Sequence, residues 1–254
     1  VLIFLVLLVW WLDISPDNGT QFLDYFSGKA RLSLVAEGAG FKVAAYDKTY
    51  GDKRAQKRGK RSAMDLNSNA GMVLAISLIL RSKLDELVAA FGVVCSTWVP
   101  VNKGTSKRCY LCPHGDENVV SVRKGNKMMA RSTILMYLVI AAGGNYVLEN
   151  PQGSLVVLHE RYIQLLRRLL ALGVTTHKAS IWMRKFGSFT WKRTWLWSTS
   201  DLIHRLDLGC MTPQERVTTV STVVREDKDG KRTWTGNQHL KETQPLFRNY
   251  LEAY

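Results

Sequence analysis

The chain contains few cysteines and few acidic residues for its length. Its 254 residues include four cysteines, and 21 Asp and Glu stand against 35 Lys and Arg. Four unevenly spaced cysteines do not form the disulfide scaffold of a small secreted protein, so we expect an intracellular location, with the nucleus as one candidate compartment. No internal repeat or low-complexity segment is present, and 46% hydrophobic residues favour a globular core over disorder.

A long hydrophobic run is also lacking. The apolar stretch at residues 1–12 is shorter than the roughly 20 residues of a membrane-spanning helix. A shortened signal peptide, a buried strand and an extension of the gene model are three interpretations of this segment, and we favour the last two. Membrane contact is not expected, although residues 1–12 leave it open.

The shortage of acidic residues gives a net charge of +14 and a pI near 9.8. Such a charge favours a polyanionic partner, either nucleic acid or an anionic membrane surface. Seven cations are concentrated between residues 48 and 61, where they suit phosphate contact or nuclear import. This basic segment contains Lys48, Lys53, Arg54, Lys57, Arg58, Lys60 and Arg61.

Strand and helix patterns alternate along most of the chain. We expect strands at residues 21–26, 42–47, 63–66, 91–98 and 145–150, and helices at 30–39, 69–90, 127–142 and 156–172. Residues 99–126 are expected to form a long loop. This alternation predicts an α/β fold whose mostly parallel sheet carries helices on both faces.

The C-terminal part has a different pattern. Residues 178–200 resemble two strands joined at a glycine turn, and residues 222–234 a hairpin that turns at Asp229 and Gly230. A helix is expected at 243–254. We therefore divide the chain into an apolar segment at 1–20, a main domain at 21–200 and an extension at 201–254. For Trp182, Trp191, Trp195 and Trp197 we favour core packing over base stacking, with Trp195 and Trp197 on one buried face.

Polar residues gather where the predicted strands end. These positions are residues 26–28, Asp47, Asp65, Cys95, and Glu149 with Asn150. Parallel sheets bind ligands at the carboxyl ends of their strands, so we expect one site there. Asp47 follows the Gly28 turn by 19 residues, the spacing at which an acid contacts the ribose of a nucleoside cofactor.

These segments resemble the cytosine-5 DNA methyltransferases. The stretch FSGKARLSLVAEGAGFKVAAYD is similar to their opening motif, which is F-x-G-x-G, then L-S, A-G-F and a strand ending in an acid. The segments VVCSTW, YVLENP and WKRTWLW occur in the order of the family's Pro-Cys loop, Glu-Asn-Val and Gln-x-Arg-x-Arg motifs, and TGNQ resembles its late Gly-Asn-Ser motif. A group of uncharacterised protist proteins shares the Glu-Asn-Pro segment and the KRT strand. The similarity spans residues 21–199, and the sequence departs from the family at Ala30, Val94, Ser96 and Pro151.

The resemblance implies a Rossmann-like fold that binds S-adenosylmethionine and methylates a nucleic-acid base, with DNA favoured over RNA. Cofactor contacts would come from Phe26, Ser27 and Gly28 near the methionine part, Asp47 at the ribose and Asp65 at the adenine. Cys95 would add to carbon 6 of cytosine, Glu149 would contact the ring nitrogen and amine, and Arg193 would hold the base. A thiolate is required because carbon 5 of cytosine is otherwise a poor nucleophile. Nucleic-acid contacts would come from Lys53, Arg54, Lys57, Arg58, Lys60 and Arg61.

Three hypotheses follow for function. The chain is an active methyltransferase, a degenerate methyltransferase fold that serves as a nucleic-acid or protein interaction module, or a decaying or virus-derived gene product. Metal binding is not expected, because Cys109, Cys112 and His114 have the spacing of half a zinc site but no evident fourth ligand.

Overall fold

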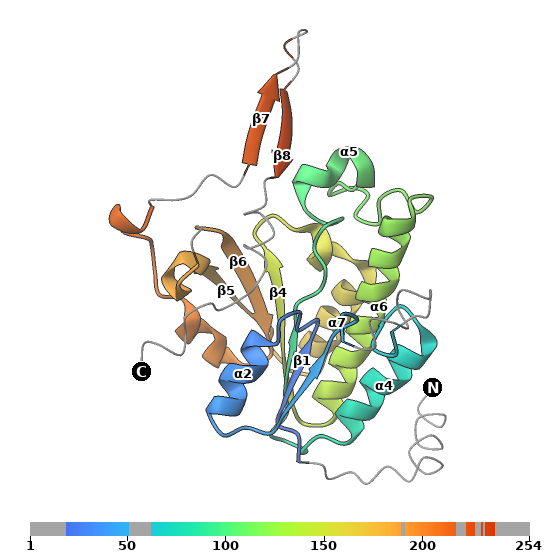
Figure 1. The fold of residues 1–254 in the computed structure, drawn as a ribbon. Coiled ribbons are helices and arrows are strands. Elements are labelled where there is room, and N and C mark those ends of the chain that lie inside the picture. Colours follow the sequence, from blue (N-terminus) through green and yellow to red (C-terminus); the bar gives the residue numbers. More distant parts are fainter. Residues whose placement is uncertain are drawn as a thin grey trace.

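The computed structural model describes residues 19–50, 62–188, 191–216, 222–226, 230 and 232–236. Within them the protein is an α/β structure built on a six-stranded sheet of order β2-β1-β3-β4-β6-β5 (Figure 1). The strands are β1 (Phe22–Tyr25), β2 (Val43–Tyr46), β3 (Val88–Phe91), β4 (Asn145–Pro151), β5 (His177–Trp182) and β6 (Arg193–Ser198). The first four pair in parallel, whereas β6 runs antiparallel to both β4 and β5. The mostly parallel α/β architecture predicted from the sequence is confirmed, and it is compatible with a Rossmann-like fold.

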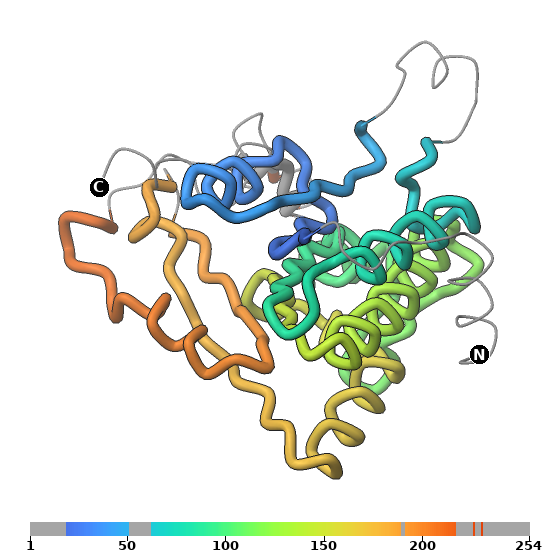
Figure 2. The backbone as a smooth tube through the Cα atoms, turned by 90° about the horizontal axis from the view of Figure 1, so that it is seen from below, coloured from blue at the N-terminus to red at the C-terminus, as the bar shows by residue number. Residues whose placement is uncertain are grey.

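The sheet carries helices on both faces (Figure 2). On one face α2 (Arg31–Gly38) packs against β1 and β2, and the buried hydroxyl of Ser33 donates to Asp24. On the other face lie α4 (Asn69–Leu80), α6 (Val120–Ala141) and α7 (Glu160–Ala171). The main hydrophobic core lies between these three helices and the sheet.

Side-chain alternation in the short parallel strands explains this division. Leu23 and Tyr25 point into the main core, and Asp24 between them points toward α2. The strands β1, β2 and β3 end at the same level in Tyr25, Tyr46 and Phe91. Tyr25 stacks on Phe91 with ring centroids 4.9 Å apart, and its centroid lies 5.5 Å from that of Tyr46. The last residues of these three strands therefore form a cluster of aromatic rings at the carboxyl edge of the sheet.

The antiparallel pair has a second, smaller core. Ala179, Ile181 and Leu196 pack there against residues of two 3₁₀ segments, η3 (Met183–Phe186) and η4 (Asp201–Leu206). Further along the chain, β7 (Thr222–Glu226) and β8 (Arg232–Gly236) form the predicted hairpin. The predicted helix at 243–254 and the apolar segment at 1–18 lie outside the described residues.

Several predicted boundaries were wrong. Residues 63–66 form turns instead of a strand, because the carboxylate of Asp65 accepts from Asn67 and its carbonyl accepts from Ser68. These hydrogen bonds prepare the start of α4.

The helix expected at 69–90 ends at Leu80, and the following strand is Val88–Phe91 instead of 91–98. The expected loop at 99–126 contains η1 (Pro100–Asn102), α5 (Lys103–Ser106) and the start of α6, and the helix expected at 156–172 divides into η2 (Leu155–Leu158) and α7.

Candidate functional site

The loop after β1 has an unusual backbone. Phe26, Gly28 and Ala30 have φ angles of 65°, 56° and 54°, all in the left-handed region. These are the three positions of the F-x-G-x-G pattern. For a bulky residue such as Phe26 this conformation is a genuine outlier, and such strain is concentrated at functional sites. Ala30 keeps the conformation of the glycine it replaces, directly before α2. The first, third and fifth positions of the F-x-G-x-G pattern are therefore those at which this turn has a left-handed backbone.

Asp47 connects the ends of β1 and β2. Its Oδ2 accepts from the backbone N–H of Gly28 at 2.9 Å, and its Oδ1 accepts from the N–H and hydroxyl of Thr49 at 2.8 and 2.7 Å. A carboxylate has about four acceptor positions, so about one is left for a ligand. Asp47 can therefore accept from one hydroxyl of a ribose. Next to it, the hydroxyl of Ser27 donates to that of Tyr50 at 2.9 Å.

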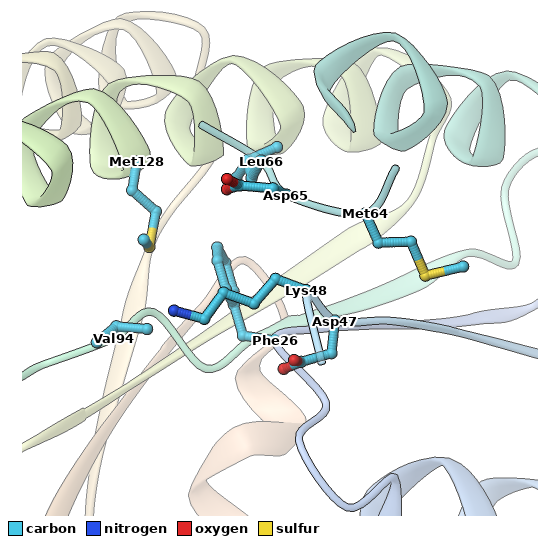
Figure 3. Close-up of a pocket in the computed structure, with 8 residues that line it drawn as sticks. All are labelled: Phe26, Asp47, Lys48, Met64, Asp65, Leu66, Val94 and Met128. Atoms are coloured by element: carbon cyan, nitrogen blue, oxygen red, sulfur yellow. The ribbon is translucent and has the colours of Figure 1, made fainter. Parts of the chain in front are cut away.

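A pocket of about 290 Å³, a volume that includes some open solvent, lies at this edge of the sheet (Figure 3). Only about 30 Å³ of it is cavity that a water-sized molecule can enter, far below the usual range of about 300–1,000 Å³ for a small-molecule site, so its lining residues would have to move to admit a ligand of nucleoside size. The ring of Phe26 stands in its middle, with Asp47 on one side and Asp65 on the other. Three of the residues predicted to bind the cofactor therefore converge. The lining residues are Phe26, Asp47, Lys48, Met64, Asp65, Leu66, Val94 and Met128.

Two residues that the sequence analysis missed hold Asp65 in place. Arg131 of α6 donates to the carbonyl oxygen of Leu66 at 2.7 Å and to that of Ser68 at 2.5 Å, so it ties the segment after Asp65 to α6. Gly71 lies so close to Asp65 that a Cβ atom would overlap the Asp65 carbonyl oxygen. Glycine within an apolar helical stretch was the only sequence signal for this close approach.

Cys95 lies in the loop beyond β3, four residues after Phe91, where its carbonyl accepts from the N–H of Trp98 at 2.8 Å. The thiol is half-buried, and burial raises its pKa above the ordinary value. The positive charge of Lys192 opposes this shift, whereas the negative charge of Glu149 adds to it. At neutral pH the resting form is the protonated thiol.

Glu149 and Lys192 form an ion pair, with Nζ 3.4 Å from Oε1 and both side chains largely buried. Lys192, which the sequence analysis did not single out, occupies the position beside the thiol and the acid. Arg193 points to the opposite face of the sheet, as strand alternation requires of the next residue. There its Nε donates to the hydroxyl of Ser180 at 2.8 Å. The structure thus pairs Glu149 with Lys192, whose charges both act on the Cys95 thiol, and places Arg193 on the other face.

The remaining predictions concern other parts of the chain. The cations at positions 53–61 lie outside the described residues. Among the residues that are described, no helix is long and apolar enough to cross a membrane. In this same portion of the chain, no group of three or more His, Cys, Asp or Glu side chains is arranged to hold a metal ion. Comparison with known protein families and with curated proteins finds no match for this chain.

Proposed function

We propose that the protein is an S-adenosylmethionine-dependent methyltransferase acting on a nucleic-acid base, with carbon 5 of cytosine in DNA as the favoured target. The convergence of Phe26, Asp47 and Asp65 on one pocket carries this proposal. In support, the six-stranded, mostly parallel sheet is compatible with the Rossmann-like fold that the sequence resemblance implies.

The residues that line the pocket offer the contacts that an adenosyl group requires. Phe26, Met64 and Met128 would supply apolar contacts to the adenine, and Asp65 would accept from its amino group. Asp47 would accept from one ribose hydroxyl with its remaining acceptor position. When bound, the cofactor supplies an electrophilic methyl group.

The neighbouring side chains would act on the base. Cys95 would pass its proton to the Glu149 carboxylate as its sulfur adds to carbon 6, and Lys192 would stabilise the thiolate as it forms. Glu149, protonated in this way, would donate to the ring nitrogen and so offset the negative charge that develops on the ring. Lys192 is thereby a positioning residue for both groups, since it pairs with Glu149 and acts on the thiol.

Calorimetric titration with S-adenosylmethionine tests the pocket. We expect micromolar binding by the parent protein, and roughly tenfold or greater weakening in Asp47→Asn and Asp65→Asn, because each loses a hydrogen bond to a charged acceptor. Glu37→Gln, on the exposed surface of α2, is the matched control and should bind like the parent. An absence of binding at high micromolar cofactor contradicts the proposal.

Transfer of a labelled methyl group to cytosine-containing DNA tests the chemistry. Cys95→Ser should abolish incorporation, and Glu149→Gln should reduce it by about a hundredfold or more, within the range of a general acid. Incorporation by Cys95→Ser at the parental rate would refute the covalent mechanism while leaving a methyltransferase.

A catalytically silent interaction module is the second candidate. The raised pKa of the Cys95 thiol, the Glu149–Lys192 ion pair and the largely occupied Asp47 carboxylate favour it. This alternative predicts that nucleic acid binds while S-adenosylmethionine does not.

A further inference from the structure

The outer face of β5 and β6 carries aromatic and cationic side chains in register. Residues directly paired across antiparallel strands point to the same face, and side chains alternate along each strand. The pairs on this face are Lys178 with Trp197, Ser180 with Trp195, and Trp182 with Arg193. We call these six residues the tryptophan face.

The tryptophan face is turned away from the small core. Ala179, Ile181 and Leu196 bury the other side of the two strands against η3 and η4. Of the three tryptophans, Trp197 packs against the main core, whereas Trp182 and Trp195 belong to neither core cluster of the described residues. The shared face expected for Trp195 and Trp197 is confirmed, but only Trp197 packs against a core, and both indoles are partly buried.

Two cations lie over the indole rings. Lys178 Nζ is 3.7 Å from the ring centroid of Trp195, and the guanidinium of Arg193 is 5.0 Å from that of Trp182. Arg193 is held there by Ser180. Neither cation forms an ion pair with a carboxylate in the described parts of the chain, whereas Lys185 pairs with Glu215 and Lys192 with Glu149.

From this geometry we propose that the tryptophan face is a stacking platform for single-stranded nucleic acid. Aromatic side chains stack on bases regardless of sequence, and neighbouring cations contact the phosphates. Alternate side chains on one strand are roughly 7 Å apart, which separates Trp195 from Arg193 and from Trp197 by a regular step. Lys178 is exposed, so its ammonium group can leave the indole for a phosphate while a base takes its place.

Single strands fit these residues better than the other polyanions. The bases of duplex DNA are stacked on one another, so they leave no free face for an indole. An acidic peptide would pair with Lys178 and Arg193 but would leave the indoles unused. The net charge of +14 favours any polyanion, so Trp182 and Trp195, which lie outside both core clusters, carry the distinction.

The platform reaches the edge of the sheet that carries the candidate site. Arg193 opens β6 beside the end of β4, where its carbonyl accepts from the N–H of Gln152 at 3.0 Å. Glu149 lies on the same strand β4. The Glu149 side chain projects from the opposite face, paired with Leu196, so a strand held on the platform would have to cross this edge of the sheet to reach Glu149, a relation that rests on the proposed function.

The test compares two oligonucleotides of about 12 nucleotides, within the usual site size. One is oligothymidylate, and the other is an abasic strand of equal charge. We expect the parent protein to bind the base-bearing strand at least tenfold more tightly, with quenching of tryptophan fluorescence. Trp195→Leu should remove most of that preference, Lys178→Ala should weaken both complexes, and Lys83→Ala, which removes the same charge elsewhere, should change neither.

Trp195→Phe keeps an aromatic ring, so it should keep the preference for oligothymidylate over the abasic strand. This variant shows whether the loss in Trp195→Leu comes from the missing ring or from a folding defect. Equal binding of the two strands, or tight binding of polyglutamate, overturns the stacking proposal. Titration of the same variants with S-adenosylmethionine separates it from the proposed function: platform variants should bind the cofactor like the parent, and Asp47→Asn should bind oligothymidylate like the parent.

Discussion

The parallel and antiparallel parts of this sheet present their polar groups in different ways. In the parallel part, β1, β2, β3 and β4 are covered by helices, so the candidate site consists of groups at or beyond the strand ends. In the antiparallel part, β5 and β6 bury one face, so the other can carry tryptophans and cations along the strands. One site depends on loops held by the core, and the other on strand alternation. Variants in the parallel part should therefore alter stability and cofactor binding, whereas variants in the antiparallel part should alter nucleic-acid binding.

Gly71→Ala should have the largest effect on the parallel part. The added methyl group overlaps the backbone of Asp65 and approaches the hydroxyl of Tyr46, and neither can move without shifting the strand edge or α4. We expect a loss of about 3 kcal/mol in the free energy of unfolding, measured with urea, together with weaker S-adenosylmethionine binding. Gly104→Ala has open space around it and should change stability by less than about 1 kcal/mol. Parent-like stability of Gly71→Ala would show that the close approach is not required.

Asp24→Asn should change the stability of the parallel part in a pH-dependent way and leave nucleic-acid binding by the tryptophan face unchanged. Burial raises the pKa of Asp24 from 3.8 to about 6, so the folded state binds this proton more tightly than the unfolded state. Its stabilising contribution is present below about pH 4 and is lost as the pH rises to about 6. We therefore expect the variant to match the parent near pH 4 and to be more stable by about 3 kcal/mol at pH 7, with oligothymidylate binding unchanged.

Ser33→Ala provides a check on that prediction. The Ser33 hydroxyl lowers the pKa of Asp24, so its removal should shift the pH window upward. A difference between Asp24→Asn and the parent that does not vary between pH 4 and 7 would contradict the protonation model.

Lys192→Gln tests the link between the thiol and the ion pair. The ammonium group of Lys192 lowers the pKa of Cys95 and pairs with Glu149. Its loss removes the first effect and leaves the negative charge of Glu149 unpaired, so the pKa of Cys95 should rise further. Alkylation of Cys95 by iodoacetamide at pH 7.5, followed by mass spectrometry, should slow by up to about tenfold, which corresponds to one pKa unit. Lys192→Arg should restore the rate, and Lys185→Gln should not alter it. An unchanged rate in Lys192→Gln would place Lys192 too far from the thiol to matter.

Ala30→Gly should have the smallest effect. A left-handed conformation costs an L-residue about 1–2 kcal/mol, and the greater freedom of glycine in the unfolded chain offsets part of the gain. We expect stabilisation by less than about 1 kcal/mol, measured by thermal unfolding, with cofactor binding at least as tight. Gly28→Ala should show the opposite sign through backbone strain alone, because a Cβ there meets no atom within 4 Å.

The sequence predicted the α/β class and most elements because hydrophobic periodicity is a local property. It failed where polar side chains or pairing with another strand decide the local structure, because hydrophobic periodicity detects neither. Residues 63–66 have an apolar character suited to a strand, but Asp65 and Ser68 use their polar groups to begin α4. The stretch from Arg81 to Phe91 continues a helical pattern, but Val88 and its neighbours gain more by pairing between β1 and β4.

The candidate site was predictable where it lies in loops at strand ends, since parallel strands bring Phe26, Asp47 and Glu149 to one edge. The partners of these groups were not predictable. Lys192 and Arg193 are adjacent in sequence and equally basic, and strand register alone decides which of them reaches Glu149. Likewise, the N–H of Gly28 uses one acceptor position of the Asp47 carboxylate, and this hydrogen bond depends on the left-handed turn.

The insertion of β6 between β4 and β5 has a consequence for synthesis on the ribosome. The chain makes β5 first, yet β5 is joined to the sheet through β6, which leaves the ribosome later. Until then the apolar side chains of β5, Ala179 and Ile181, have no strand to lie against, and the exposed edge of β4 is a template for other extended chains. Newly made protein should therefore depend on chaperones most strongly while residues 177–198 are emerging.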